Sequence, residues 1–315
     1  MFIFMTILLT GAGGFIGSHV RHALLDAGHV VIAPTRSRTG KTDTATLQWL
    51  EGFFGDPSVL KKARRVPEAI IHLAAIRGAG AGERDHYQKV NVIGTQALLD
   101  YARQNRVKRF IYCSTVGVLG TIPARLPAAP DDPPRADGPY HHTKWMAEKH
   151  VREAADKDMT TMIVRPTITY GRGDDGFIPR LIDLVRKGWM VTPAREVKIH
   201  LLSVRAFASL LEQCVRGDAG WGGTFHVADK SPVALRDVVD FISKQTRGDT
   251  YPRWLKAPSF LYDAMAGFLK FARRDALKTS VELISKSWYY NIDATISQLG
   301  YQPVETLDQM GDLLS

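Results

Sequence analysis

A tyrosine and a lysine four residues apart carry the clearest chemical signal in the chain. The segment YHHTK places Tyr140 and Lys144 at the spacing that brings two side chains to one face of a helix. A free phenol has a pKa of about 10, which is too high for a base near neutral pH. A neighbouring ammonium favours the phenolate and lowers that pKa. The pair therefore predicts that Tyr140 exchanges a proton with a substrate alcohol or carbonyl oxygen.

A hydroxyl that could orient the same oxygen precedes this pair in the chain. Thr115, or its neighbour Ser114, ends the apolar segment RFIYCST, where a hydroxyl can donate a hydrogen bond to a substrate oxygen. His141 and His142 lie inside the tyrosine–lysine segment, and adjacent side chains on a helix diverge by about 100°. We therefore interpret these histidines as helix-surface or pocket-edge residues and expect no metal site.

A glycine-rich segment near the start of the chain predicts a phosphate-binding turn. TGAGGFIG (10–17) spaces Gly11, Gly14 and Gly17 three residues apart, between an apolar segment and a helical one. In such a turn the first glycine permits the bend, the second lets a pyrophosphate approach the backbone, and the third packs the helix against the strand. The helix N-terminus then directs free N–H groups at the phosphates. We predict dinucleotide binding; a strand-to-helix turn without a ligand is the alternative.

The segment after the second apolar run indicates which dinucleotide is bound. A carboxylate there accepts hydrogen bonds from the ribose of NAD, whereas an arginine accommodates the 2′-phosphate of NADP. APTRSRTGK (33–41) contains no Asp or Glu but carries Arg36, Arg38 and Lys41. We therefore expect NADP(H), with NAD(H) as the alternative and solvated loop charges as the interpretation without a ligand. Asp56 is either a contact for the adenine amino group or a helix cap.

Short apolar segments alternate with helical patterns through the first half of the chain. Buried strands are predicted at residues 7–10, 29–34, 69–75, 109–115 and 160–166. Helices are predicted at residues 16–27, 97–106 and 140–156. This alternation is typical of an α/β protein with a Rossmann-like, doubly wound parallel sheet. We expect an NAD(P)-binding domain over residues 1–166 that also receives parts of about 200–228, and a smaller, interleaved substrate region over 167–315.

Composition excludes several classes of protein. The 315 residues are 45% hydrophobic and 23% charged, as in ordinary globular proteins, and the only cysteines are Cys113 and Cys214. A disulfide scaffold is therefore not expected, and a reducing, cytoplasmic compartment fits. The net charge is +9 but no nucleic-acid motif accompanies it, so we expect a small-molecule substrate and no nucleic-acid partner.

Two apolar segments raise the question of membranes. MFIFMTILLT at the start has no preceding Lys or Arg and continues into glycines, so a strand is a better interpretation than a signal peptide. No apolar run reaches the about 20 residues of a membrane span. Residues 254–274 combine aromatic, apolar and basic side chains, as in a membrane-surface helix. We favour a buried amphipathic helix there, and Pro258 argues against one long helix.

Six segments together resemble those of the extended short-chain dehydrogenases/reductases, the NAD(P)-dependent epimerase/dehydratase family. The resemblance covers nearly the whole chain, through TGAGGFIG (10–17), IIHLAA (70–75), NVIGT (91–95), STVGVLG (114–120), RPTITYG (165–171) and LGYQP (299–303). It implies that Thr115 is the catalytic hydroxyl, Tyr140 the acid/base, Lys144 its partner and Asn91 a structural residue. It also implies a homodimer and a cofactor lined by Gly11, Gly14, Phe15, Ile16, Leu73, Ala74, Ala75 and Pro166.

The resemblance leaves more than one function open. Nucleotide-sugar epimerases of the family show a GDGxQxRD-like segment, which residues 187–203 lack, and dehydratases show Asp-Glu where this chain has Val116 and Gly117. Both differences favour an NADP(H)-dependent oxidoreductase acting on a ketone or secondary alcohol, similar to the 3β-hydroxysteroid dehydrogenase and dihydroflavonol reductase branch. A nucleotide-sugar epimerase or dehydratase with tightly bound NAD is the alternative. A non-catalytic dinucleotide-binding protein is a second alternative, which the presence of both Tyr140 and Lys144 disfavours.

Overall fold

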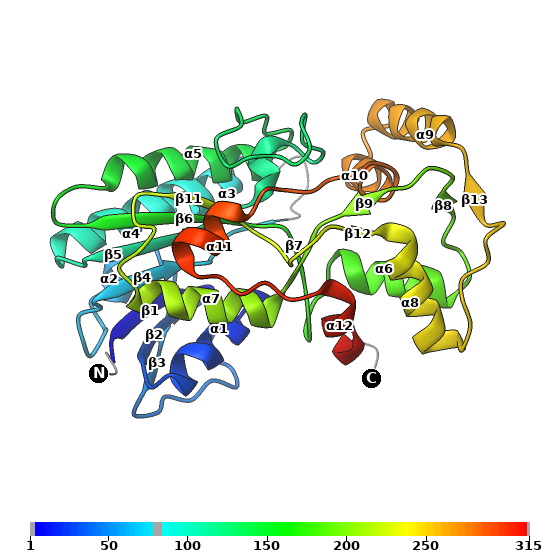
Figure 1. Cartoon of the computed structure of the whole chain (residues 1–315). Coiled ribbons are helices and arrows are strands. Elements are labelled where there is room, and N and C mark those ends of the chain that lie inside the picture. Colours follow the sequence, from blue (N-terminus) through cyan, green and yellow to red (C-terminus); the bar gives the residue numbers. More distant parts are fainter. Residues whose placement is uncertain (1–3, 78–83, 314–315) are drawn as a thin grey trace.

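A seven-stranded parallel sheet forms the centre of the molecule, in the order β11-β6-β5-β4-β1-β2-β3 (Figure 1). The computed structural model describes residues 4–77 and 84–313. The strands are β1 (Thr6–Thr10), β2 (Val30–Thr35), β3 (Leu47–Glu51), β4 (Ala69–His72), β5 (Arg109–Cys113), β6 (Thr160–Pro166) and β11 (Thr224–Val227). Their apolar side chains point to both faces of the sheet and are buried there, as in a sheet covered on both sides. The predicted Rossmann-like α/β fold is confirmed.

Helices cover both faces of this sheet. On one face α1 (Phe15–Asp26) packs against α7 (Val204–Arg216), and on the other α4 (Gly94–Gln104) packs against α5 (Pro139–Ala154) (Figure 1). Each face of the sheet has its own apolar core. Alternate residues of each strand belong to one core or the other, because successive side chains of a strand point to opposite faces. The intervening segments contain α2 (Pro57–Leu60), α3 (Arg84–Tyr87), the π-helix η1 (Gln88–Ile93) and the 3₁₀ helix η2 (Val116–Leu119).

The chain leaves the sheet after β6 and returns to it once. β11 pairs in parallel with β6 at the sheet edge, so residues 224–227 belong to the central sheet despite their distance in sequence. The excursion and the C-terminal part form a smaller layer of helices and two-stranded pairs. The pairs are β7 (Ile168–Tyr170) with β10 (Leu201–Ser203), β9 (Lys198–Ile199) with β12 (Val233–Ala234), and β8 (Thr192–Pro193) with β13 (Lys256–Ala257). The division of domains at residue 166 stays a prediction.

The smaller region has a core of its own. Its helices are α6 (Phe177–Arg186), α8 (Leu235–Arg247), α9 (Ser259–Phe271), α10 (Asp275–Ser285), α11 (Asp293–Leu299), α12 (Thr306–Met310) and the 3₁₀ helix η3 (Gly311–Leu313). Apolar residues of α6 and α8 pack around Trp288 and Tyr290, which are nearly fully buried. α11 returns to contact β11, which ties the C-terminal segment to the central sheet.

One buried carboxylate joins three segments where the two regions meet. Asp229 accepts hydrogen bonds from the Tyr170 hydroxyl at 2.8 Å, the Ser203 backbone N–H at 2.8 Å and the Thr306 hydroxyl at 2.7 Å. Burial raises the pKa of Asp229 to about 6, and the three donors only partly offset that effect. β7, β10 and α12 are therefore held together by a polar contact inside the molecule.

The structure corrects the interpretation of residues 254–274 as a buried helix. Pro258 does end the preceding segment, and α9 begins directly after it at Ser259. Only Tyr262 and Ala266 of α9 are buried, whereas Phe260, Phe268 and Phe271 are exposed. Among the helices that the structure describes, none is both long and apolar enough to cross a membrane.

Candidate active site

The carboxyl ends of β1, β4, β5 and β6 surround a cavity of about 400 Å³. In a doubly wound parallel sheet this edge is where ligands bind. The glycine turn after β1 forms one wall, and Thr115, Tyr140 and Lys144 form another. Of the residues expected at the cofactor, the cavity is lined by Gly11, Gly14, Phe15, Ile16, Gly17, Leu73, Ala75 and Pro166.

The glycine turn has the backbone geometry that a dinucleotide site requires. Gly11 has φ of +76°, a conformation that favours glycine, and a Cβ there would meet the Ala74 backbone N at 2.9 Å. A Cβ on Gly17 would clash with the Gly11 carbonyl oxygen, so α1 begins in close contact with the turn. The Ala74 backbone therefore packs against Gly11 of the turn, and Ala74 does not line the cavity. No described side chain caps the N-terminus of α1, whose N–H groups are left to face a phosphate.

Lys144 is buried with its ammonium held at the end of β5. Its Nζ donates a hydrogen bond of 2.6 Å to the Cys113 carbonyl oxygen and lies 4.2 Å from the centre of the Tyr112 ring. The side chain is 1% exposed. Burial lowers the pKa of Lys144 to about 8, because desolvation disfavours the charged form. The ammonium form still predominates at neutral pH.

Tyr140 lines the same cavity, but its pKa is shifted opposite to the sequence-based expectation. Burial of the hydroxyl raises the pKa of Tyr140, and the Cys113 thiol adds to the increase. The predicted lowering by Lys144 is therefore wrong for the protein without ligands. The Tyr140 phenol is therefore neutral near neutral pH, which is the form that can donate a proton.

Thr115 lies at the start of η2 and faces the cavity. Its Oγ1 accepts a hydrogen bond of 3.1 Å from the Gly117 backbone N–H, which makes Thr115 the N-cap of η2. The hydroxyl proton is left to donate to a ligand. Asn91 has a structural role, because it bonds the backbone N–H and carbonyl of Ile76 and the Thr143 hydroxyl. It joins the segment after β4 to the helix that carries Tyr140.

Further polar residues surround the cavity, among them one of the two histidines that the sequence placed on the helix surface or at the pocket edge. His141 lines the cavity, and its Nδ1 lies 2.7 Å from an Asp137 carboxylate oxygen. Burial would raise the pKa of Asp137, but the hydrogen bonds from His141 and the Thr121 backbone N–H outweigh it and lower that pKa to about 2. Arg77 lies at the mouth and pairs with Asp175 at 2.7 Å. The only sequence signal for the His141–Asp137 contact was the position of His141 inside the YxxxK segment.

The smaller region supplies the rest of the cavity wall, which is largely apolar but also carries Thr169, Asp174 and Thr279. Ile168, Phe177, Leu283, Trp288 and Tyr290 line it, beside Val116 of η2. Leu283 belongs to α10 and Trp288 to the segment after it, so residues more than 100 positions beyond Tyr140 complete the site. Nothing local in the sequence indicates that these segments meet the glycine turn. Among the described residues, no group of His, Cys, Asp and Glu side chains is arranged to hold a metal ion.

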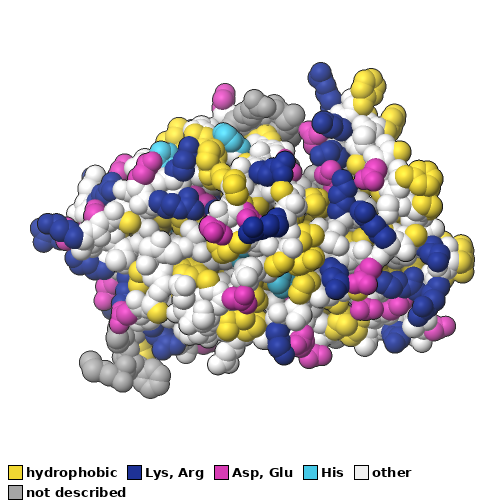
Figure 2. Space-filling model, turned by 45° about the horizontal axis from the view of Figure 1, so that its top comes forward, with side chains coloured by type: hydrophobic (Ala, Val, Ile, Leu, Met, Phe, Trp, Pro, Cys, Tyr) yellow, Lys and Arg dark blue, Asp and Glu magenta, His cyan; other side chains and the backbone are white. Residues whose placement is uncertain are grey.

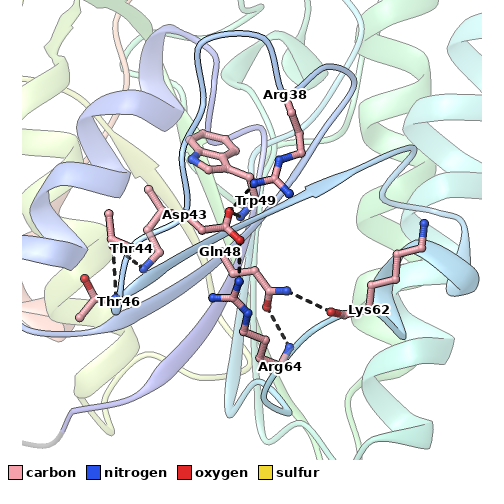
Figure 3. A network of polar contacts seen from close by, with 9 residues as sticks. Arg38, Asp43, Thr44, Thr46, Gln48, Trp49, Lys62 and Arg64 are labelled. Carbon is pink, nitrogen blue, oxygen red and sulfur yellow. Dashed lines mark hydrogen bonds and ion pairs between the residues drawn. The ribbon is translucent and has the colours of Figure 1, made fainter.

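The basic residues after β2 have different partners (Figure 3). Arg38 pairs with Asp43 at 2.8 Å, and the same carboxylate accepts from Arg64 at 2.9 Å. Lys41 donates a hydrogen bond to the Ser37 carbonyl, and its ammonium lies over the Trp49 ring. Its side chain also lies beside the glycine turn: a Cβ added at Gly13 would be 3.6 Å from the Lys41 Cε. Arg38 is therefore held within its own loop, whereas Lys41 reaches the turn.

Arg36 and Asp56 complete the residues expected at the cofactor. Arg36 is exposed at the end of β2, and no described side chain pairs with it. Asp56 accepts a hydrogen bond of 2.8 Å from the Ser58 backbone N–H and caps α2, which matches the helix-cap alternative. That hydrogen bond also lowers the pKa of Asp56. Neither residue lines the central cavity.

A parallel sheet with a glycine turn and a tyrosine–lysine helix at its carboxyl edge defines a Rossmann-type dinucleotide enzyme. The family model for the NAD dependent epimerase/dehydratase family matches residues 7–208. The chain belongs to this family, and its relatives are reductases, dehydrogenases and epimerases of the extended short-chain dehydrogenase type.

Two curated relatives and one solved structure illustrate the range of this family. A 2-alkyl-3-oxoalkanoate reductase of Stenotrophomonas maltophilia is 31% identical over 75% of this chain and 74% of its own. A ketoreductase of Stigmatella aurantiaca is named for a 4-hydroxy-2-methyl-3-oxo-4-farnesyl-3,4-dihydroquinoline-1-oxide. It is 28% identical over 98% of this chain and 96% of its own. The crystal structure of a Thermotoga maritima UDP-glucose 4-epimerase with UDP-glucose matches with a TM-score of 0.78 and 21% identity, over 98% and 97% of the two chains.

Proposed function

We propose that the chain is an NADP(H)-dependent reductase of apolar ketones. The observation that carries this proposal is the composition of the cavity, in which the Tyr140 hydroxyl and the glycine turn share space with an apolar wall. Among the described residues that line it, Arg77 and Lys144 are the only Lys or Arg. Arg77 is already paired with Asp175, and Lys144 with the Cys113 carbonyl. A nucleotide sugar would bring a diphosphate that finds few free cations here.

The names of the curated relatives support a ketone substrate. The Stenotrophomonas and Stigmatella relatives are both named for reduction of a 3-oxo compound, and each named compound carries an alkyl or farnesyl group. An apolar wall made of Ile168, Phe177 and Leu283 suits such a group, because its burial removes apolar surface from water. We therefore expect a 3-oxo compound with an apolar chain as the substrate class.

The preference for NADP(H) is supported by the charges beside the turn. Lys41 reaches the glycine turn, Arg36 projects from the end of β2, and the connecting loop 36–42 contains no Asp or Glu. Asp43 is the nearest carboxylate along the chain, and Arg38 and Arg64 neutralise it. A 2′-phosphate would meet Arg36 and Lys41, whereas NAD would find no carboxylate for its ribose.

The proposed mechanism assigns one task to each polar side chain. When bound, the dinucleotide supplies the hydride that reduces the carbonyl carbon. Tyr140, kept neutral by burial, donates its proton to the carbonyl oxygen. Thr115, whose Oγ1 accepts a hydrogen bond from the Gly117 N–H, donates a second hydrogen bond to that oxygen. Lys144 is anchored on the Cys113 carbonyl, and its remaining N–H groups would hold the cofactor ribose.

Spectrophotometry of NADPH oxidation tests this function. The purified chain should oxidise NADPH with a 2-alkyl-3-oxo acid, and Tyr140→Phe should reduce kcat at least about 100-fold while NADPH binding is retained. Tyr101→Phe, on α4 away from the cavity, is the matched control and should keep wild-type turnover. Full turnover by Tyr140→Phe would overturn the acid assignment. Epimerisation of UDP-glucose without NADPH oxidation would favour the sugar-modifying alternative.

A further inference from the structure

α9 presents an apolar surface to solvent that the fold leaves uncovered. Phe271 is 88% exposed, Phe268 68% and Phe260 66%, and Leu261 and Met265 are also exposed. The spacing of these residues places them on one side of the helix. Isolated exposed apolar residues are normal, but a contiguous group on one helix marks an interaction surface.

The opposite side of α9 is fixed firmly to the protein. Tyr262 and Ala266 pack against Val281 of α10, and the Tyr262 hydroxyl donates a hydrogen bond of 2.8 Å to the Val191 carbonyl. β13, just before α9, pairs with β8, and Lys286 lies 3.6 Å from the Asp263 carboxylate. The helix is therefore held in place with its second apolar face outward, and the exposure is built into the fold.

Basic side chains surround the exposed face. Residues 253–286 contain seven Lys or Arg and three Asp or Glu. Lys270 and Arg274 follow the apolar face near the C-terminal end of α9, and Lys256 precedes it; no described acidic side chain pairs with any of them. In Figure 2 hydrophobic and basic side chains lie side by side at the end of the molecule that α9 forms, at the upper right. The surface thus combines apolar and positive character.

We propose that α9 docks this protein on an anionic phospholipid membrane, lying in the plane of the interface. Aromatic side chains at the apolar face enter the acyl boundary, and Lys256, Lys270 and Arg274 contact lipid phosphates, as in interfacial amphipathic helices. The helix has 13 residues, so it lies on the bilayer and does not cross it.

Charge argues for lipid rather than for a second copy of the chain. A two-fold symmetric contact through α9 would bring the same basic side chains toward one another, which costs free energy. An anionic bilayer instead complements both the apolar face and the cations around it. α9 also packs on α10, whose Thr279 and Leu283 line the cavity, so docking brings the active site close to the lipid surface.

Vesicle co-sedimentation of the full chain tests the proposal without reference to enzyme activity. The wild-type chain should bind vesicles that contain phosphatidylglycerol and should bind pure phosphatidylcholine much more weakly. Phe260→Ser/Phe268→Ser/Phe271→Ser should lower the partition coefficient at least about tenfold, because the exposed rings provide the apolar contact. Lys270→Gln/Arg274→Gln should lower it about 30-fold, at about 1 kcal/mol per basic side chain.

The control places equivalent changes on apolar residues outside α9. Val66→Ser/Ile296→Ser alters two exposed apolar residues on other elements and should bind vesicles like the wild type. Unchanged vesicle binding by the triple serine variant would overturn the proposal. So would equal binding to both kinds of vesicle. A wild-type dimer that the serine variant converts to a monomer, without any vesicle binding, would assign the surface to self-association instead.

Discussion

The ammonium of Lys144 and the backbone carbonyl of Cys113 are joined by a hydrogen bond of 2.6 Å. This contact links α5, which carries Tyr140, to the end of β5, two residues before Thr115. Burial disfavours the charged form of Lys144, and its hydrogen-bond acceptor is a neutral carbonyl. Together these account for a pKa of about 8, below the ordinary value for lysine. Lys144 therefore acts both as a structural contact and as a titrating group in the cavity.

Substitution of Lys144 should impair the reaction more than the fold. We expect Lys144→Met to lower kcat/KM for the ketone about 100-fold or more, because the ammonium that orders the cofactor and the phenol is lost. Wild-type kcat/KM should fall as pH rises through about 8, where the free protein loses this proton. Lys149→Met, on the exposed side of α5, is the control. A wild-type profile that stays flat to pH 10 would contradict the assignment.

Two basic residues should select between the dinucleotides. Arg36→Gln/Lys41→Gln should raise the Kd for NADPH about tenfold or more and leave the Kd for NADH unchanged, because only NADPH carries the 2′-phosphate. Lys62→Gln/Arg65→Gln, which removes two exposed basic side chains elsewhere on the surface, provides a charge-matched comparison. The measurement is a fluorescence titration with each cofactor. Equal losses of affinity for NADPH and NADH would remove these residues from the phosphate site.

A buried ion pair beneath the cavity should be costly to break. Arg165 donates two hydrogen bonds, of 2.8 and 2.7 Å, to the fully buried Glu148 carboxylate. Burial would raise the pKa of Glu148, but the Arg165 contact outweighs it and lowers that pKa. Arg165→Met should reduce the free energy of unfolding by about 3 kcal/mol, since the buried Glu148 carboxylate then keeps, among the described residues, only the partly exposed Arg152, at 2.8 Å, as an ionic partner.

Urea denaturation at several pH values measures this loss. The Arg165→Met defect should shrink at acid pH, where Glu148 takes up a proton more readily once Arg165 is gone. Arg165→Met/Glu148→Met should recover much of the stability, because both charges are then removed. A single variant as stable as the wild type at pH 7 would show that the pair contributes nothing.

Two buried histidines should make the protein sensitive to acid. Burial lowers the pKa of His200 to about 4 and that of His226 to about 3, below the ordinary value near 6.5. The unfolded chain therefore binds more protons between pH 6.5 and about 4, and this stability, fully present above pH 6.5, is lost as pH falls. Asp229 opposes the effect, because its pKa of about 6 makes the folded state bind the extra proton between about pH 4 and 6.

Removal of one histidine should flatten this dependence. His226→Phe should decrease the slope of unfolding free energy against pH by about 1.4 kcal/mol per pH unit between pH 4 and 6, the contribution of one proton. The substitution keeps a ring beside Tyr290, which His226 contacts edge-on at 5.3 Å. The exposed His142→Phe variant should retain the wild-type slope. An unchanged slope for His226→Phe would mean that this ring does not titrate with unfolding.

The sequence alone determined those features whose cause is local. Apolar runs predicted five of the seven strands of the central sheet, β1, β2, β4, β5 and β6, because a strand buried on both faces must be apolar throughout. The spacing of Gly11, Gly14 and Gly17 predicted the turn, because a side chain at Gly11 or Gly17 would collide with neighbouring backbone. The four-residue interval between Tyr140 and Lys144 placed both on one helix, whose rotation per residue is a property of the backbone.

Only the tertiary structure decided which groups meet and how much water remains around them. Burial, a property of the whole fold, reversed the expected pKa shift of Tyr140. The partner of Arg38 proved to be Asp43 across the loop, and the apolar wall came from α10 and Trp288, far along the chain. The sequence of an apolar helix is the same whether its surface packs against protein or faces solvent. The exposure of α9 therefore could not be predicted from its residues. Solvation and contacts between distant segments depend on packing that no local pattern records.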